Sequence, residues 1–233
     1  MESFVKKVFS DVSDRYSVMN DIMSLGIHRL WRRKFIACFT DVRGKTLIDV
    51  AGGTGDIAKR FLRKGGERVL VIDNNQDMLK KGLADVLDSD EMRLLERMKW
   101  QLGDSTDLNV DEQFDFYSNA FGLRNSSNFA DTVSNSFKVV KSGGKILFME
   151  FLNPRYEKSS VLMATYEHYL RYIIPVLGKV FANNYDAYRY LADSITNFIA
   201  KEWMLDTLAR CGGCDVKCEV MNNICAIYSC TKS

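Results

Sequence analysis

A glycine-rich loop and the aspartates around it are the residues whose types and spacing best suit chemistry. The loop runs from Asp49 to Asp56 (Asp-Val-Ala-Gly-Gly-Thr-Gly-Asp) and directly follows a short β-branched segment. Glycines in such a loop let the backbone approach a ligand that a Cβ atom would exclude. Asp73 ends the next apolar segment, where a carboxylate can accept both hydroxyls of a ribose. The pattern predicts a nucleoside site with contacts at Asp49, Gly52, Gly53, Thr54, Gly55 and Asp73.

Two nucleoside ligands suit this loop, and charge separates them. Gly53 to Ala58 satisfies the dinucleotide pattern G-x-G-x-x-A, so a nicotinamide dinucleotide and a dehydrogenase are one hypothesis. A dinucleotide would place its pyrophosphate at the N-terminus of a helix that begins near Asp56, whose carboxylate would repel it. S-adenosylmethionine has no phosphate and carries a cationic sulfonium and a cationic amino group. We therefore expect S-adenosylmethionine as the cofactor, with Asp49 and Asp56 as compatible neighbours.

A further carboxylate follows the next predicted strand. In Gly103-Asp104-Ser105, the Asp104 carboxylate can accept the exocyclic amino group of adenine, and Ser105 can serve the ring nitrogens. Each aspartate taken alone could equally be a helix cap or a solvated turn. Carboxylates at three successive strand ends, together with the glycine loop, favour the nucleoside interpretation.

A parallel sheet would bring these strand ends to one edge. Apolar segments alternate with helical periodicity, which predicts βαβ units and a doubly wound α/β fold of Rossmann-like type with seven strands. The predicted strands are 46–50, 68–72, 99–102, 114–118, 145–149, 216–221 and 224–228, with helices over 57–64, 78–85, 129–140 and 202–210. The last two strands would form an antiparallel hairpin through a two-residue turn at Asn222-Asn223.

The remaining segments are predicted to be helical additions to this sheet. Residues 4–39 keep helical spacing, and the tyrosine-rich segment after the fifth strand does so until Pro175, which is expected to stop its helix. We expect one domain of 1–233, divided into a helical cap (1–43), a cofactor-binding sheet (44–153), a helical insertion (154–200) and a terminal helix with the hairpin (201–233).

The composition excludes several classes of protein. The chain has 233 residues and a formal charge of +2, too little for a dedicated nucleic-acid binder. It has no apolar run of transmembrane length, and residues 1–21 lack the core of a signal peptide, so a cytoplasmic location is expected. Five of the six cysteines fall in the last 23 residues, but neither His28 nor His168 is close in sequence, so reduced cysteines and no metal ion are expected.

Several longer motifs resemble one family closely. They are Tyr16-x3-Asn20-Asp-x-Met23, Gly26-Ile-His-Arg-x-Trp31, the loop at 49–56, Phe121-Gly-Leu-Arg-Asn125 and Tyr188-Arg-Tyr-Leu-Ala-Asp-Ser194. Together they resemble the ubiquinone/menaquinone biosynthesis C-methyltransferases (UbiE/MenG type), a branch of the class I S-adenosylmethionine-dependent methyltransferases. Two positions depart from the family pattern: Ala120 stands where a serine is common, and Lys141-Ser-Gly-Gly144 replaces Lys-Pro-Gly-Gly.

The resemblance implies methyl transfer to a ring carbon of a polyprenylated quinol. The acceptor would be demethylmenaquinol, 2-methoxy-6-polyprenyl-1,4-benzoquinol or both, and the cofactor contacts would fall on Thr54, Asp73, Asp104 and Ser105. Another class I methyltransferase with a different small or lipidic acceptor remains an alternative. So does a non-catalytic nucleoside-binding subunit of a quinone-synthesis complex.

A quinol ring carbon needs a nearby group that favours loss of the hydroxyl proton. We assign Arg124 to stabilising the quinolate oxygen or holding a water, with Asn125 orienting it. Tyr16, Asn20 and His28 are expected to close the pocket from the cap, with His28 as an alternative base. Arg124, Asn125 and His28 also have purely structural interpretations, as an ion pair, a helix cap and a packed ring.

The prenyl tail would need an apolar wall, for which the insertion from Val161 to Tyr190 and the amphipathic N-terminal helix are the candidates. Basic residues of the cap could meet anionic headgroups in a peripheral membrane contact, although a charged helix face is often simply solvated. A homodimer or a quinone-synthesis complex is a further expectation. The basic residues concerned are Arg29, Arg32, Arg33 and Lys34.

Overall fold

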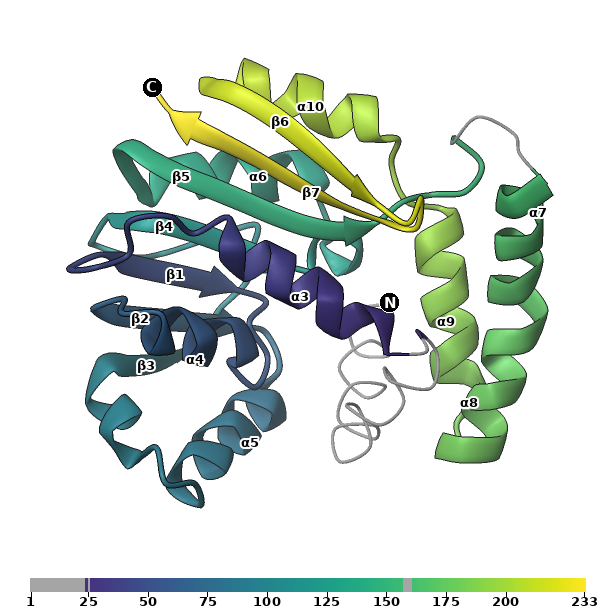
Figure 1. Cartoon of the computed structure of the whole chain (residues 1–233), viewed down its shortest axis with the longest axis horizontal. Helices are drawn as coiled ribbons and strands as arrows, with labels where there is room; N and C mark the ends of the chain where they lie inside the picture. Colours follow the sequence, from purple (N-terminus) through teal and green to yellow (C-terminus); the bar gives the residue numbers. More distant parts are fainter. Residues whose placement is uncertain (1–23, 25, 157–160) are drawn as a thin grey trace.

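The strands form one seven-stranded sheet in the order β3-β2-β1-β4-β5-β7-β6 (Figure 1). The computed structural model describes residues 24, 26–156 and 161–233. Neighbours from β3 to β5 pair in parallel, and β7 lies antiparallel between β5 and β6. The bounds are β1 (Thr46–Val50), β2 (Arg68–Asp73), β3 (Met98–Leu102), β4 (Phe114–Ala120), β5 (Val140–Phe151), β6 (Gly213–Met221) and β7 (Cys225–Lys232).

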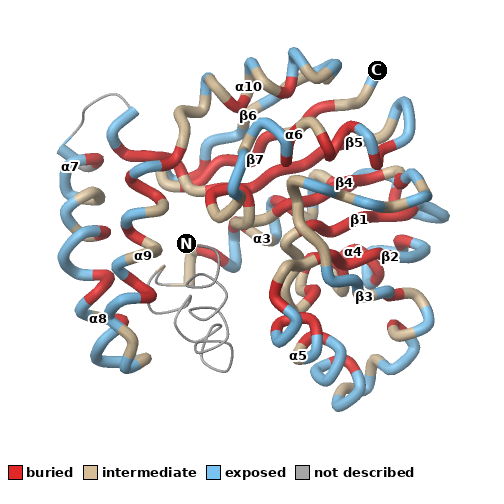
Figure 2. The backbone as a smooth tube through the Cα atoms, turned by 180° about the vertical axis from the view of Figure 1, so that it is seen from behind, coloured by how far each residue is buried: buried red, intermediate tan, exposed pale blue. Residues whose placement is uncertain are grey.

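Helices cover both faces of the sheet because successive side chains of each central strand point to opposite sides. In β1, Leu47 packs into the core shared with α3, α4 and α5, whereas Ile48 packs into the core shared with α6 and α10. Figure 2 shows the buried strands between these layers. The helices are α3 (Ile27–Ala37), α4 (Asp56–Arg63), α5 (Gln76–Leu87), α6 (Phe129–Lys138) and α10 (Lys201–Arg210).

This architecture confirms the predicted doubly wound fold with its terminal hairpin, but local details differ. The hairpin loop has three residues rather than two, because Met221 pairs with Cys225. The helix predicted to reach Val140 ends at Lys138, and Val140 instead begins β5. The strand predicted at 145–149 is extended, since β5 already includes Ser142–Gly144, an irregular part where the register with β4 shifts.

The helical insertion after the fifth strand is confirmed, but Pro175 does not stop its helix. α7 (Val161–His168) continues through a π-helical turn at Tyr169–Ile173 into α8 (Ile174–Ala182). Pro175 lies in the first turn of α8, where a proline needs no N–H donor. α9 (Tyr185–Thr196) returns antiparallel to α8, as Figure 1 shows.

The insertion has a small core of its own. Leu170 and Ile174 pack with Tyr188 and Ile195 from α9, and Phe151 at the end of β5 packs against this cluster. The backbones of α8 and α9 approach closely at Gly178, where an added Cβ atom would lie 2.2 Å from Tyr188 Cδ2. The insertion is therefore a packed element anchored at the end of the sheet.

Gly178→Val is expected to force α8 away from α9 and to lower the free energy of unfolding by roughly 1–3 kcal/mol. Thermal and urea unfolding of the purified protein measure this loss. Val176→Ala, on the exposed side of the same helix, is the control and should change stability by less than about 0.5 kcal/mol. Equal stability of the two variants would contradict this account of the α8–α9 contact.

Candidate active site

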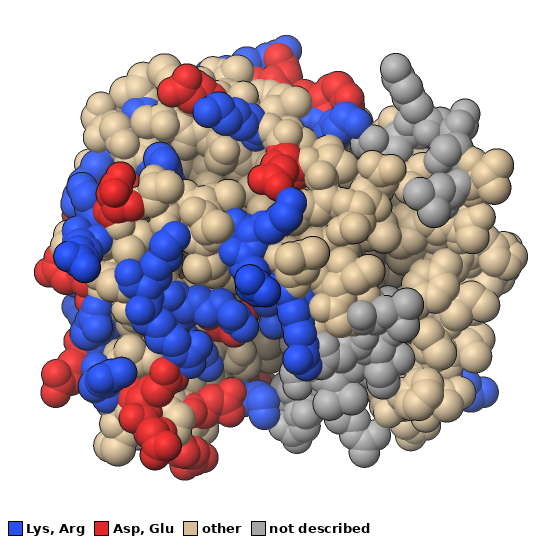
Figure 3. All heavy atoms as spheres, viewed as in Figure 1, with Lys and Arg blue, Asp and Glu red and all other residues tan. Residues whose placement is uncertain are grey.

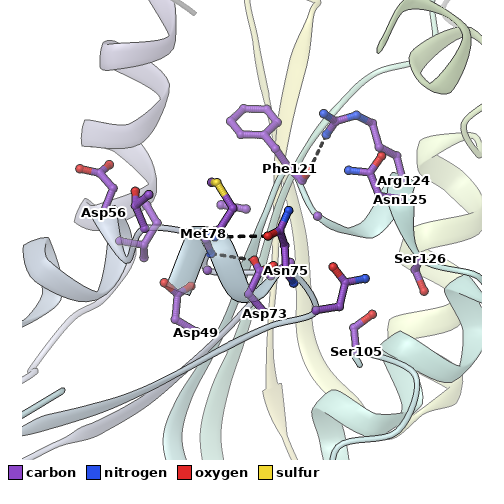
Figure 4. Close-up of a pocket in the computed structure, with 18 of the residues that line it drawn as sticks. Asp49, Asp56, Asp73, Asn75, Met78, Ser105, Phe121, Arg124, Asn125 and Ser126 are labelled. Atoms are coloured by element: carbon purple, nitrogen blue, oxygen red, sulfur yellow. Dashed lines mark hydrogen bonds between the residues drawn. The ribbon is translucent and has the colours of Figure 1, made fainter. Parts of the chain in front are cut away.

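A cavity of about 270 Å³ lies at the carboxyl ends of β1, β2 and β4 (Figure 4). In the sheet order, β1 and β4 are neighbours, and the chain leaves them toward opposite sides. Such a switch point opens a crevice beyond the strand ends, where ligands bind in α/β sheets. Residues from the glycine loop, from the turn after β4 and from α9 all line this cavity.

The turns that follow β1 and β4 have an unusual backbone. Ala51 and Phe121 both adopt left-handed φ angles, of 54° and 60°, which are uncommon for residues with a side chain. The two turns also touch, since a Cβ atom added at Gly122 would lie 2.3 Å from Ala51 Cβ. Strained residues that line a cavity often mark a functional site.

The glycine loop is held against two aspartates. A Cβ atom at Gly52 would lie 2.9 Å from Asp49 Oδ2, so only glycine fits there. The N–H of Gly53 donates to Asp73 Oδ2 at 2.8 Å. Gly52, Gly53 and Thr54 line the cavity as predicted, whereas Gly55 forms the N-cap of α4 and is not among the described lining residues.

Asp49 carries a buried carboxylate in which only one of the two oxygens forms a hydrogen bond with the described residues. Its side chain is 1% exposed, and Oδ1 accepts a 2.6 Å hydrogen bond from Ser118 Oγ. Oδ2 has no hydrogen-bond partner among the described residues. Burial raises the pKa of Asp49 to about 7, although the Ser118 hydrogen bond opposes this shift. A cationic ligand group beside Oδ2 would stabilise the ionised form.

The other predicted carboxylates lie on the same side of the cavity. Asp73 Oδ1 accepts the N–H of Asn75 at 2.8 Å, and burial raises the pKa of Asp73. Asp104 Oδ1 accepts the backbone N–H and the hydroxyl of Thr106, both at 2.7 Å. The hydroxyl of Ser105 lies 3.1 Å from that of Thr132. The structure thus brings Asp49, Asp73, Asp104 and Ser105 together around one cavity.

Asp56 differs from the expectation because its charge is compensated. It begins α4 and lines the cavity, but it pairs with Arg60 at 3.1 Å and with Arg32 at 3.5 Å. Its repulsion of a pyrophosphate is therefore weaker than the sequence alone suggested. The buried Asp49, without a cation among the hydrogen-bond partners that the structure describes, is the stronger argument for a cationic ligand.

Hydrogen-bond donors form the opposite wall. Arg124 Nη1 donates to the Phe121 carbonyl at 2.5 Å and to Glu150 Oε1 at 2.8 Å. Asn125 Oδ1 accepts a 3.2 Å hydrogen bond from the Tyr190 hydroxyl, which α9 supplies. Figure 4 shows Arg124 and Asn125 together across the cavity from Asp49 and Asp73. Arg124 and Asn125 line the cavity as predicted.

Of the three contacts predicted from the cap, the structure describes only His28, which lies outside this cavity. His28 is 7% exposed, its Nδ1 lies 2.8 Å from Ser24 Oγ, and it is not among the described residues that line the cavity. Its packed position in α3 matches the structural interpretation of a histidine beside a tryptophan. Tyr16 and Asn20 lie outside the described residues.

Several residues that line the cavity are not predicted from the sequence, and four of them carry polar or sulfur atoms from three different parts of the fold. Asn75 and Met78 follow Asp73 closely, so their position after a strand end was a usable signal. Arg32 and Tyr190 come from the cap and the insertion, and no local pattern places them at this edge.

Three further findings concern membrane-spanning helices, metal sites and cysteines among the described residues. Within residues 24, 26–156 and 161–233, no helix combines the length and the apolar character that crossing a bilayer requires. In the same ranges, no three His, Cys, Asp or Glu side chains gather as a metal site. The six cysteines are free thiols, and Cys225 and Cys230 are buried in β7.

The glycine loop and the Oδ2 atom of Asp49, which has no hydrogen-bond partner among the described residues, fit S-adenosylmethionine. Solved structures of methyltransferases that bind this cofactor have a similar fold. The chain is similar to magnesium protoporphyrin IX methyltransferase from Synechocystis with bound S-adenosylhomocysteine, with a TM-score of 0.69, 11% identity and full coverage of both chains. It is also similar to human N-acetylserotonin methyltransferase with S-adenosylmethionine, with a TM-score of 0.64, 17% identity and coverage of 97% of this chain and 58% of that one. At these identities the likeness shows the fold of a Rossmann-like methyltransferase.

Sequence comparison gives the family. Residues 1–232 match the model of the ubiE/COQ5 methyltransferase family, so the chain belongs to that family and is a methyltransferase that depends on S-adenosylmethionine. It is 35% identical to the ubiquinone/menaquinone biosynthesis C-methyltransferase of Cereibacter sphaeroides, over 89% of this chain and 82% of that protein. It is also 35% identical to the human mitochondrial 2-methoxy-6-polyprenyl-1,4-benzoquinol methylase, over 97% of this chain and 78% of that protein.

Asp49→Asn is expected to stabilise the free protein and to weaken cofactor binding. The pKa of Asp49 lies above its unfolded value, so ionisation destabilises the fold as the pH rises from about 4 to about 7. At pH 8 the variant should therefore have a higher melting temperature, by roughly 2–4 °C for each kcal/mol of desolvation cost that is removed. It should also lose most of the increase in melting temperature that S-adenosylmethionine causes in the wild type.

Titration calorimetry in buffers of different ionisation enthalpy provides the second measurement. The wild type should release more protons than Asp49→Asn on binding S-adenosylmethionine near pH 7, because a bound cation lowers the Asp49 pKa. Asp206→Asn, an exposed carboxylate of α10 that is paired with Arg210, is the control and should keep the wild-type proton release. Identical release from wild type and Asp49→Asn would contradict the role of Asp49.

Proposed function

We propose that the protein transfers a methyl group from S-adenosylmethionine to a ring carbon of a polyprenylated quinol. Its family and its curated relatives make it a C-methyltransferase of quinone biosynthesis. The proposed acceptors are demethylmenaquinol and 2-methoxy-6-polyprenyl-1,4-benzoquinol. The observation that carries the proposal is the cavity itself, with carboxylates on one wall and the donors Arg124 and Asn125 on the other.

The carboxylate wall would hold the cofactor. Asp73, at the end of β2, would accept the ribose hydroxyls, and Asp104 with Ser105 would face the adenine. The spare oxygen of Asp49 would accept from a cationic group. When bound, S-adenosylmethionine supplies an electrophilic methyl group on a sulfonium.

The donor wall would act on the quinol. A ring carbon becomes nucleophilic when an adjacent ring hydroxyl loses its proton, because the charge on oxygen is shared with the ortho carbon. Arg124 stays protonated, so it favours the quinolate without accepting the proton itself. A carbon–carbon bond would then form as the methyl–sulfur bond breaks and leaves its electron pair on sulfur. The ring carbon would lose its hydrogen as a proton to water, which restores the aromatic ring. Holding both partners in line would account for much of the acceleration.

Arg124→Ala is expected to keep S-adenosylmethionine binding and to lower turnover by roughly 10²–10³-fold, as the loss of an oxyanion donor does elsewhere. Arg124→Lys keeps a cation beside Glu150 and should also lose turnover, because it lacks the forked donors. Arg210→Ala, on the exposed end of α10, is the control.

The assay incubates the purified protein with S-adenosylmethionine and each reduced quinol, and mass spectrometry detects the gain of one methyl group. A methylated naphthoquinol, benzoquinol or both supports the proposal and identifies the acceptor. No product in a single turnover, with S-adenosylmethionine bound, would favour a non-catalytic subunit. Wild-type turnover by Arg124→Ala would remove Arg124 from the mechanism.

We also propose that the outer face of the insertion contacts a lipid bilayer, where a polyprenylated acceptor resides. Val176 and Val180 are 52% and 68% exposed on one side of α8, next to the exposed Tyr172. In Figure 3 uncharged atoms dominate the side of the molecule formed by the insertion, while lysines and arginines gather over α3 and α4. On α3, Arg32 and Lys34 are paired with Asp56 and Glu219.

Vesicle sedimentation tests this contact. Vesicles with anionic phosphatidylglycerol should bind the wild type more strongly than neutral phosphatidylcholine vesicles, and added salt should weaken that difference. Val176→Asp with Val180→Asp should reduce binding at least about tenfold without changing the melting temperature. Unchanged vesicle binding, or a concentration-dependent dimer that these substitutions break, would contradict a lipid contact at this face.

A further inference from the structure

The carboxylate of Glu150 forms hydrogen bonds with both the side chain and the backbone of Arg124. Its Oε1 accepts from the Arg124 guanidinium at 2.8 Å, and its Oε2 accepts from the Arg124 backbone N–H at 3.2 Å. The same Oε1 accepts the N–H of Phe151 at 2.9 Å. The Glu150 side chain is 1% exposed and the Arg124 side chain 5%, so water cannot replace these bonds easily.

The hydrogen bonds with Glu150 determine which N–H groups of Arg124 remain available to a ligand. Nη1 is occupied by Glu150 and the Phe121 carbonyl, while Nε is buried and has no hydrogen-bond partner among the described residues. The guanidinium also lies over the Phe151 ring, with Cζ 5.3 Å from the ring centroid. One end of the guanidinium is therefore anchored and Nε is enclosed by protein, so Nη2, which has no hydrogen bond to the described residues, is the donor left for a ligand in the cavity.

Tyr190 orients Asn125 through a hydrogen bond, as Glu150 orients Arg124. Its hydroxyl donates to Asn125 Oδ1 at 3.2 Å, across 65 residues of sequence. Because the amide oxygen accepts this bond, the amide NH₂ group is the end that faces other partners. Asn125, like Arg124, then presents donors rather than an acceptor.

We infer that Glu150 and Tyr190 are positioning residues that hold Arg124 and Asn125 as a preorganised pair of donors for one oxygen of the acceptor. This inference rests on the proposed function and extends it. Donors fixed in a dry site stabilise developing negative charge without reorganising during the reaction. Glu150 has a second effect, because its charge compensates that of Arg124 and so limits how strongly the quinolate is held. A quinolate held too strongly would be a poorer nucleophile.

Three variants separate geometry from charge. Glu150→Gln removes the compensating charge, so the acid limb of the pH profile of kcat, which follows ionisation of the bound quinol, should move to lower pH while the plateau of kcat falls roughly 10–100-fold. Glu150→Asp keeps the charge but shortens the side chain, so kcat should fall with the acid limb unmoved. Tyr190→Phe should lower kcat about tenfold and change KM for the quinol by less than about threefold.

A direct probe of the donors is the ionisation of 1-naphthol bound to the protein with S-adenosylhomocysteine, followed by absorbance. The wild type should ionise bound naphthol at lower pH than free naphthol, Glu150→Gln at still lower pH, and Tyr190→Phe at higher pH than the wild type. Glu167→Gln and Tyr172→Phe, both in the insertion and outside the cavity lining, are matched controls.

The outcomes separate the inference from the proposed function. Naphthol ionisation that responds as described, without methylation of any quinol, would support the donor pair and overturn the acceptor. A folded Glu150→Gln with an unmoved acid limb and unmoved naphthol ionisation would overturn the inference, since a merely structural role changes only stability and rate. If Glu150→Gln does not fold, Tyr190→Phe decides, and wild-type values for it would overturn the inference as well.

Discussion

The hydrogen bond between Ser118 and Asp49 determines where the functional cavity lies. Asp49 and Ser118 are opposite each other in the last paired positions of β1 and β4, and both are buried. Beyond this pair the two chains separate, and each turns through a left-handed residue, Ala51 or Phe121. The cavity exists because pairing stops there. The same bond uses one oxygen of Asp49 and leaves the other directed at the loop glycine that must remain without a side chain.

The two walls of the cavity carry opposite charges. One wall carries buried carboxylates whose burial raises their pKa, and it is suited to a cation. The other carries a guanidinium whose charge is compensated by a buried glutamate. Attack of a quinolate on a sulfonium consumes one negative and one positive charge. A water-poor site strengthens that attraction and does not have to support separated charges in the product. The division therefore suits a methyl transfer between oppositely charged partners.

The sequence predicted the carboxylate side of the cavity far better than the Arg124 side, for a physical reason. The carboxylates follow strand ends, and parallel strands bring their ends to one edge, so Asp49, Asp73 and Asp104 could be placed from the sequence. The Arg124 side is assembled by contacts without a local pattern, such as Tyr190 with Asn125. Pro175 was expected to end a helix, but a π-helical turn precedes it and places it in a first turn.

Charge arguments from sequence were limited in the same way. The sequence implies a free carboxylate at Asp56, but α3 brings Arg32 within 3.5 Å of it. Arg124 had both a catalytic and a structural interpretation, and the structure makes these compatible, since the ion pair with Glu150 is what holds its other donors in place. The insertion has its own small core and contributes Tyr190 from α9. That core is joined to the core beside α3 and α4 through Phe151, which packs against both, so substitutions in it act on the Tyr190 side of the cavity more directly than on the glycine loop.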